Sequence, residues 1–410
     1  MHQEKIFKGK TVAILSGGGD TPAINSSIEN IRNRALILGF KVYGIRQGWK
    51  GLLGEGDIVD LTNQPYNGLY GGTALCSSRT NPFPSEKNPE DRVPQIIANL
   101  KRYKIDVLVT IGGDDTNGAA KRLYEREGIP VIGFPKTIDN DLRTKTIHTY
   151  NGKEIEAVLC PGFPTAALNV SNMTRHLRST NESHQRVMVV EVMGRDAGWL
   201  TGSAIFGGAE LALVPEYEMT AERKERFFET VKQRYQEKKN LIIAVSEGVR
   251  WWNEETQKLS MVYASSETDE YGHPRFGGVS GVIASEISAR LGIQARSQIS
   301  GYYPRSGMCG EYDRQLTSSL ADKVLDLLIR EDYGKMPVMS KIVPTEQLEE
   351  YNTDTIDMGS IGNRPLQNDY YDSDSFTFTD AYVDFLTHIL GEPYTSSFGY
   401  TFAKVNPDLL

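Results

Sequence analysis

The sequence predicts an α/β protein in which parallel sheets are covered by helices on both faces. Short, continuously apolar runs recur along the 410 residues, and each is followed by a turn rich in glycine and aspartate and then by a stretch that can form a helix. Continuous apolar runs are typical of strands that are buried on both faces. Repeated strand–turn–helix units therefore indicate βαβ units and parallel sheets. The runs lie at 11–15, 105–111, 130–134, 186–192 and 241–245.

Each of the five runs leads into a distinctive turn. In chain order the turns are SGGGDTPAIN, GGDDTNG, PKTIDND, MGRDAGWLTG and SEG. In a parallel sheet such turns fall at the carboxyl ends of the strands, where this architecture binds ligands. Glycine permits tight turns and close backbone approach, and the helix that follows offers unpaired N–H groups to an anion. The sequence therefore predicts an anion-binding site at these strand ends.

The chain is expected to divide into two α/β domains and a C-terminal part. Residues 1–143 hold three of the units, and 144–310 form a second α/β domain. Residues 311–410 are predicted to contribute C-terminal helices, with a long helix within 311–335, and an extension that packs back on the body. The stretch 144–160 is polar and non-periodic, which predicts a surface insertion beside PKTIDND.

Composition argues against several classes of protein. Lys plus Arg number 45 and Asp plus Glu 53, a net charge of −8 that is unfavourable for binding nucleic acid. No apolar run approaches the roughly 20 residues of a membrane helix, and the N-terminus lacks a signal-peptide pattern. The three cysteines are few, odd in number and widely spaced, which predicts a reduced, cytoplasmic protein without a disulfide framework.

Four carboxylates follow two of the strands. Asp114 and Asp115 lie in GGDDT, and Asp139 and Asp141 lie in TIDND, where an extended turn would place both side chains on one side. One of that pair can act as a general base while the other helps to hold Mg²⁺ or orients its partner. Such a cluster needs cations and is typical of phosphoryl transfer, in which charge neutralisation does most of the catalysis. The candidate cations are Mg²⁺, Lys136, Arg79 and Arg195.

Five segments closely resemble the phosphofructokinase family: GGDDT, PKTIDND, SHQRVMVVEVMGRDAGWLTG, SEG and ARSQISGYYPRSG. The resemblance covers about residues 10–335, and TIDND and VEVMGR are its most specific motifs. It implies two Rossmann-like three-layer α/β domains with the active site in the cleft between them, plus a C-terminal extension. The first domain would bind the phosphoryl donor and Mg²⁺, and the second would bind the sugar phosphate.

The resemblance also implies a role for individual residues. Asp139 matches the general base for the 1-hydroxyl of fructose 6-phosphate, Asp141 the second acid, and Asp114 the carboxylate linked to Mg²⁺. Arg195 and Lys136 complete the expected catalytic set. The residues that match the donor site are Gly18, Arg79, Asp115, Thr116, Lys136 and Thr137, and those that match the sugar-phosphate site are Thr137, Arg186, Met193, Gly194, Arg195, Glu247, Arg296, Tyr302 and Arg305.

In the family, some of the arginines in the sugar-phosphate site cross from a neighbouring subunit. The resemblance therefore implies a homodimer or homotetramer whose active sites are completed across an interface. It does not distinguish between the two assemblies.

Two positions bear on the phosphoryl donor. ATP-dependent members usually have glycine where this chain has Asp115, whose carboxylate would occupy the space of the nucleotide α-phosphate. Lys136 can neutralise pyrophosphate, which lacks the rest of the nucleotide. Together they predict a pyrophosphate-dependent, reversible enzyme. The alternatives are ATP as donor, another acceptor such as sedoheptulose 7-phosphate, and a non-catalytic regulatory subunit, which the intact Asp139 and Asp114 disfavour.

Overall fold

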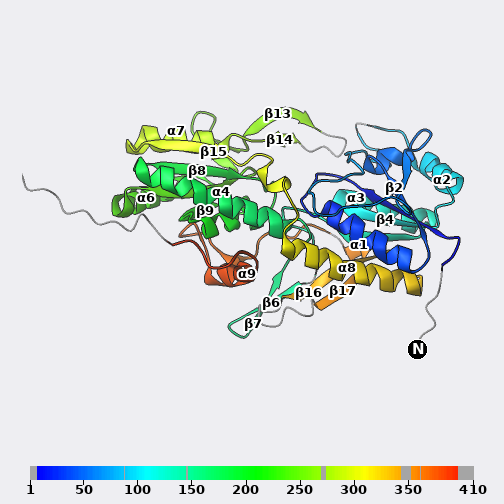
Figure 1. Cartoon of the computed structure of the whole chain (residues 1–410). Helices are drawn as coiled ribbons and strands as arrows, with labels where there is room; N and C mark the ends of the chain where they lie inside the picture. Colours follow the sequence, from blue (N-terminus) through cyan, green and yellow to red (C-terminus); the bar gives the residue numbers. More distant parts are fainter. Residues whose placement is uncertain are drawn as a thin grey trace, which may run out of the picture.

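The computed structural model describes residues 7–86, 88–144, 146–268, 274–342, 352–360 and 362–395. Within these ranges the strands form two main sheets and three short two-stranded ribbons (Figure 1). The two sheets lie in separate halves of the molecule. α4 (Phe163–Ser183) lies in one half and α8 (Glu311–Arg330) in the other, and the two helices approach each other between the halves.

The first sheet has the order β3-β2-β1-β4-β5-β16-β6-β7, and β17 pairs with β16. Its central strands are parallel, whereas β3, β7 and β17 are antiparallel to their neighbours. The strands are β1 (Thr11–Ser16), β2 (Lys41–Ile45), β3 (Ile58–Asp60), β4 (Val107–Gly112), β5 (Val131–Pro135), β6 (Thr146–Tyr150), β7 (Lys153–Ala157), β16 (Lys335–Ile342) and β17 (Asn352–Asp357).

The second sheet is parallel throughout and has the order β15-β8-β10-β9. Its strands are β8 (Val187–Val192), β9 (Leu211–Leu213), β10 (Leu241–Ser246) and β15 (Ala295–Ile299). The antiparallel ribbons are β11 (Trp251–Asn253) with β12 (Lys258–Ser260), β13 (Tyr263–Thr268) with β14 (Pro274–Phe276), and β18 (Tyr371–Asp372) with β19 (Thr377–Phe378).

Helices cover both faces of each main sheet. None of those in the described ranges combines the length and hydropathy that a membrane span requires. Besides α4 and α8, the helices are α1 (Ile24–Ile37), α2 (Val93–Arg102), α3 (Asp114–Glu127), α5 (Trp199–Gly202), α6 (Ala221–Lys238), α7 (Val279–Leu291) and α9 (Asp380–Leu390), with short 3₁₀ turns η1 (Gly48–Leu52), η2 (Ser203–Gly207), η3 (Tyr303–Arg305), η5 (Met358–Ser360) and η6 (Asn368–Tyr370).

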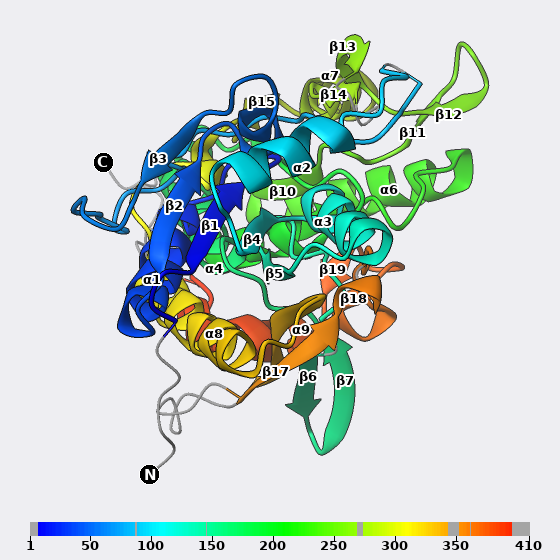
Figure 2. The same ribbon diagram turned by 90° about the vertical axis from the view of Figure 1, so that its right-hand side faces the viewer.

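Alternate residues of the central strands pack against opposite helical layers. In β1, Val12 and Ile14 belong to the core shared with α1 and α8, while Ala13 and Leu15 belong to the core shared with α2 and α3. Figure 2 shows these strands between the two pairs of helices. This two-sided burial is why the strand sequences are continuously apolar.

The five predicted strands are all present, and none of their ends differs from the predicted end by more than two residues. The helix predicted within 311–335 is α8. The prediction for 144–160 was wrong, because β6 and β7 form a hairpin that joins the first sheet through β16. One side of the hairpin is buried, at His148, Ile155 and Ala157, while the other is exposed, which explains its polar sequence.

The predicted division into residues 1–143, 144–310 and 311–410 stays a prediction. The sheets cross these boundaries, because β6 and β7 join the first sheet although they follow residue 143. The C-terminal part contributes β16 and β17 to the same sheet. It also contributes α9, whose Phe385 and Leu386 belong to a core shared with both main sheets.

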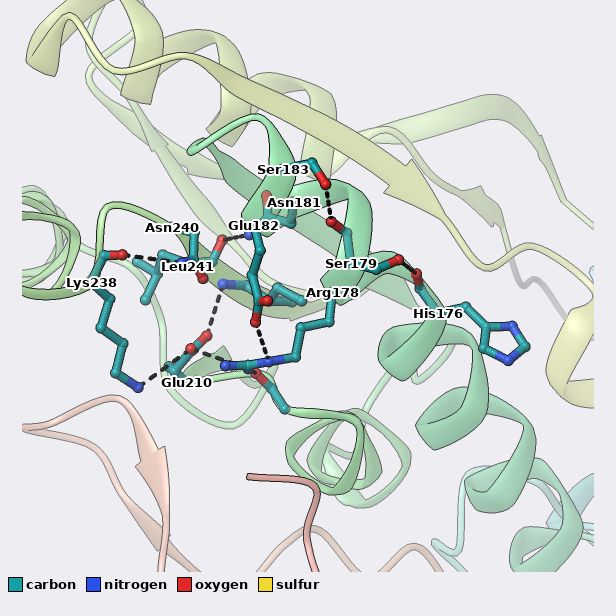
Figure 3. Close-up of polar contacts among 12 residues, drawn as sticks. His176, Arg178, Ser179, Asn181, Glu182, Ser183, Glu210, Lys238, Asn240 and Leu241 are labelled. Carbon is teal, nitrogen blue, oxygen red and sulfur yellow. Dashed lines mark hydrogen bonds and ion pairs between the residues drawn. The ribbon is translucent and has the colours of Figure 1, made fainter. Parts of the chain in front are cut away.

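A buried ion-pair network ties the elements of the second half together (Figure 3). Arg178 on α4 has its Nε 3.0 Å from Glu182 and its Nη1 3.4 Å from Glu210. The other oxygen of Glu210 accepts a hydrogen bond of 2.9 Å from the backbone N–H of Ile242, in β10. Lys238, at the end of α6, lies 3.5 Å from Glu210. Glu210 therefore connects α4, α6 and β10 from a position just before β9.

We predict that Glu210→Ala lowers the free energy of unfolding by about 2–4 kcal/mol. The side chain is largely buried, and its loss removes one acceptor from Ile242 N–H and one from the Arg178 guanidinium. The matched control is Lys238→Ala, which removes a half-exposed partner of the same carboxylate and should cost about 1 kcal/mol or less. Denaturant unfolding of both variants tests this. Equal losses would contradict the role given to Glu210.

Candidate active site

The predicted turn motifs lie at the carboxyl ends of strands from both main sheets. Residues 136–141 follow β5, and Asp114 opens α3 directly after β4. From the second sheet, 193–195 follow β8 and Glu247 follows β10. The two groups are close enough for their charges to interact, because the charge of Arg195 lowers the pKa of Asp139 and that of Asp139 raises the pKa of Glu247.

Thr137 organises the loop that carries the two acids. Its hydroxyl accepts a hydrogen bond from Asp139 N–H and donates one to Asp141 Oδ1, both at 3.0 Å. The turn is not extended as expected, because Asn140 adopts the left-handed conformation with φ 54°. Its buried amide donates to Val158 O at 2.5 Å and accepts from Cys160 N at 3.0 Å, which fixes the loop from behind.

The acids of this loop are shielded from water and close to one another. Burial raises the pKa of Asp139, although Arg305, Arg195 and Lys136 oppose the shift. Burial, together with the charges of Asp139 and Asp114, raises the pKa of Asp141 to about 7. Asp139 Oδ1 is buried and has no hydrogen-bond partner in the described part of the chain, so it is available to a ligand proton.

Lys136 supplies a buried cation beside these acids. Its Nζ donates to the carbonyl oxygens of Gly17 at 3.2 Å and Gly19 at 2.5 Å, and so connects β5 to the loop after β1. Burial and the nearby charge of Arg305 lower its pKa to about 8. The ammonium is therefore largely charged at neutral pH and suits an anionic ligand.

Arg305 bridges the two halves of the molecule. Its Nη1 donates to Asp20 O at 2.9 Å, and its Nε donates to Met193 Sδ at 3.2 Å. A cavity of about 410 Å³ opens beside it. The cavity is lined by Gly18, Gly19, Asp20, Thr73, Ser77, Arg79, Tyr302 and Arg305, so four predicted residues are joined there by four that the motifs did not identify.

Residues 193–195, the loop predicted to bind the sugar phosphate, are held by the residues around Glu247. Gly194 has φ 144°, its carbonyl accepts a hydrogen bond from Ser246 Oγ, and its N–H lies 3.5 Å from Glu247 Oε1. A Cβ at Gly248 would lie 1.8 Å from Arg195 O, so only glycine fits. Burial and the charge of Asp139 raise the pKa of Glu247 to about 7. Ser246 and Gly248 were not predicted as site residues, although they flank Glu247 in the motif SEG, which could have indicated them.

A larger cavity of about 550 Å³ is lined by Arg195, Gly248 and Glu216, among others. None of the predicted donor residues lines it, whereas Gly18 and Arg79 line the smaller cavity beside Arg305. The smaller cavity is therefore the one that belongs to the predicted donor residues.

Two predicted residues lie outside the central group, whereas Thr116 is buried in the first turn of α3 against Gly17 and Gly18, beside Lys136. Arg186 directly precedes β8, and the exposed Arg296 lies in β15 opposite Met188. Both arginines are at the amino ends of their strands, on the order of 20 Å along β8 from Arg195, which follows its carboxyl end.

The acids fit a magnesium ion that is held mainly by its ligand's phosphates. In the described ranges no three His, Cys, Asp or Glu side chains are grouped to bind a metal by themselves. The exposed Asp114, at the start of α3, nevertheless offers hard oxygen ligands at the same edge of the first sheet as residues 136–141. Mg²⁺ commonly takes one or two carboxylates plus substrate phosphates.

Comparisons with known proteins agree with the motifs. The phosphofructokinase family model matches residues 11–328. The pyrophosphate–fructose 6-phosphate 1-phosphotransferase of Dictyoglomus thermophilum is 37% identical over 324 residues, which are 77% of this chain and 86% of that protein. The ATP-dependent 6-phosphofructokinase 3 of Streptomyces coelicolor is 34% identical over 337 residues, 80% of this chain and 90% of its own.

Among solved structures, the pyrophosphate-dependent phosphofructokinase of Nitrosospira multiformis superimposes with a TM-score of 0.75 at 22% identity, over 95% of each chain. This likeness confirms the predicted α/β fold with two Rossmann-like halves. The chain belongs to the phosphofructokinase family.

Proposed function

We propose that this protein catalyses the reversible transfer of a phosphoryl group from pyrophosphate to the 1-hydroxyl of fructose 6-phosphate, giving fructose 1,6-bisphosphate and phosphate. The observation that carries the proposal is Asp139, whose buried Oδ1 has no hydrogen-bond partner in the described part of the chain and on which the charges of Arg305, Arg195 and Lys136 act. Relatives that are named for this activity, at 36–37% identity, support it.

In the proposed reaction Asp139 accepts the proton of the 1-hydroxyl. The hydroxyl oxygen bonds to the donor phosphorus, the bridging P–O bond breaks, and orthophosphate leaves with the electron pair. Arg195 and Lys136 offset the negative charge of the phosphoryl group as it moves. Asp114 and the donor phosphates would hold Mg²⁺, which supplies further neutralisation when bound.

Two residues support pyrophosphate over ATP. Asp115 is a second carboxylate in the first turn of α3, where a helix N-terminus would otherwise attract a phosphate. Its charge opposes the additional phosphate of a nucleotide. Lys136 provides a compact buried cation suited to the small pyrophosphate anion. ATP remains the second candidate, because ATP-dependent relatives are 34–35% identical to this chain.

A coupled assay with fructose 6-phosphate and Mg²⁺, given pyrophosphate or ATP in parallel, tests the donor. We expect the wild type to be active with pyrophosphate alone. The double variant Asp115→Gly, Lys136→Gly should accept ATP better: its kcat/KM for ATP, divided by its kcat/KM for pyrophosphate, should rise by at least about tenfold. Activity of the wild type with ATP alone would overturn the donor assignment. Failure of the double variant to use any ATP would mean that other residues set the donor.

Sedoheptulose 7-phosphate in the same assay tests the alternative acceptor. Inactivity with every pair of donor and acceptor would favour a regulatory subunit.

The role of Asp139 predicts that Asp139→Asn lowers kcat by about 10²–10⁴-fold, with little change in KM for fructose 6-phosphate, because the lost contact is made at the reacting proton. The wild-type kcat/KM should fall below about pH 7, since the pKa of Asp139 is raised and those of Asp141 and Glu247 are about 7. A carboxylic acid with a raised pKa holds its proton at a higher pH and cannot then act as a base. Near-normal turnover of Asp139→Asn would mean that another group is the base.

We further propose that a second copy of the chain completes the sugar-phosphate site with Arg186 and Arg296. Both residues lie at the amino ends of β8 and β15, whereas the acids lie at carboxyl ends of their strands, which supports delivery from another subunit. Exposed apolar side chains after β15 support such an interface. Of the eight large apolar side chains that are exposed in the described ranges, Ile299, Tyr302 and Tyr303 lie at the end of β15 or just after it, and Met308 pairs with Tyr70.

Mixing two inactive variants tests the shared site. Asp139→Asn and Arg296→Ala chains should each be impaired at low fructose 6-phosphate, yet a mixed dimer contains one intact site. Random exchange of dimers should therefore restore about a quarter of the wild-type activity. Exchange verified by mass spectrometry without any regained activity would show that each chain uses its own arginines.

A further inference from the structure

The segment 362–370 lies along the catalytic loop on its C-terminal side. Gly362 O accepts a hydrogen bond of 2.9 Å from Arg143 N, and Arg364 N donates one of 2.5 Å to Asp141 O. Between them Asn363 and Leu142 form an antiparallel bridge. Three consecutive residues of the segment thus pair with the backbone that carries Asp141.

The same segment also binds the loop that carries Arg195. Arg364 O accepts a hydrogen bond of 3.3 Å from Trp199 Nε1, four residues after Arg195. Glu216 Oε1 accepts from Leu366 N at 2.8 Å and from Gly198 N at 2.9 Å. Glu216 therefore joins the segment to the sugar-phosphate loop through one carboxylate oxygen.

An aromatic cluster anchors the far end of the segment. Tyr370, its last residue, is fully buried with its ring centroid 5.1 Å from that of Trp199. Its hydroxyl lies 3.1 Å from His148 Nδ1, and His148 Nε2 lies 2.9 Å from Asp384 on α9. The segment is thus fixed to β6 and α9, outside the two loops that it connects.

We propose that residues 362–370 form a positioning strap that sets the distance between the acids of the catalytic loop and Arg195. The acids belong to the first sheet and Arg195 to the second, so their alignment depends on contacts between the halves. The strap binds both loops within three residues, from Arg364 to Leu366. A displacement of about 1 Å between reacting groups can cost on the order of 100-fold in rate.

The strap lies beyond residue 328, where the family match ends, so this positioning device belongs to the C-terminal part of this chain. The inference rests on the proposed function, because it assigns the strap to the alignment of that reaction's groups.

Glu216 gives the sharpest test. Glu216→Ala removes the acceptor shared by Leu366 and Gly198, and we expect kcat to fall by about 10- to 100-fold while KM for fructose 6-phosphate stays within about twofold. Glu216→Gln keeps an oxygen in the same place and should recover most of the lost kcat. Trp199→Phe keeps an aromatic side chain but lacks the indole N–H that donates to Arg364 O. It should lower kcat and leave KM for fructose 6-phosphate unchanged.

The matched control is Glu218→Ala, two residues away, which removes an exposed carboxylate that pairs with Arg250 at 2.9 Å. Its kinetics should equal those of the wild type. The strap would be overturned if the kcat of Glu216→Ala equalled that of the control. It would also be overturned if Glu216→Gln did not recover the lost kcat, or if KM alone changed.

Hydrogen–deuterium exchange separates the strap from the proposed function. Amides at 139–143 and 194–199 should exchange faster in Glu216→Ala than in Glu218→Ala, whatever the substrate is. Unchanged exchange would overturn the strap. Faster exchange in a protein that is inactive with fructose 6-phosphate would leave the strap standing and refute only the proposed reaction.

Discussion

The buried carboxylate of Asp313 fixes the catalytic loop from outside that loop. Its two oxygens accept hydrogen bonds from Gly162 N at 2.7 Å, Thr165 N at 2.9 Å and Thr165 Oγ1 at 2.5 Å, at the start of α4. Gly162 pairs with Thr137, whose hydroxyl in turn binds the backbone of Asp139. Burial raises the pKa of Asp313 to about 6, and the three donors keep the carboxylate ionised at neutral pH. One buried charge on α8 thus determines where α4 begins and where the acids lie.

The charges of the cleft come from both halves of the molecule. A general base must be shielded from water to be reactive and must still be ionised to accept a proton. Burial alone would favour the protonated form of Asp139, and the cations Arg305, Arg195 and Lys136 oppose it. Arg305 follows the second sheet yet donates to Asp20 beside the first. The balance of charge at Asp139, the proposed base, therefore depends on the same contacts that hold the halves together.

The sequence predicted the features that local patterns encode. Buried parallel strands such as β1 and β10 are continuously apolar, and their turns carry the recognisable motifs, so the fold, the family and the position of the acids followed. Strand β15 was missed because ARSQI is polar and lies at a sheet edge, with four of its five residues exposed. The hairpin at 146–157 was missed because its pairing partner, β16, lies almost 200 residues later. The contacts of Arg364 with Asp141 and Trp199 use backbone atoms of Arg364, which leave no signature in its residue type.

Overall similarity cannot identify the donor, because relatives with either donor are nearly equally similar to this chain, at 37% and 34% identity. The feature that distinguishes pyrophosphate from ATP must therefore be local. The first turn of α3, which carries Asp114 and Asp115, is the place we propose for it. A helix N-terminus attracts an anion whatever molecule carries it, so two carboxylates in that turn satisfy the attraction internally. A further phosphate beside Asp115 would meet negative charge, whereas Lys136 offers a buried positive charge to the smaller pyrophosphate. In the proposed function the fold therefore sets the acceptor chemistry, and the charges of Asp115 and Lys136 set the donor.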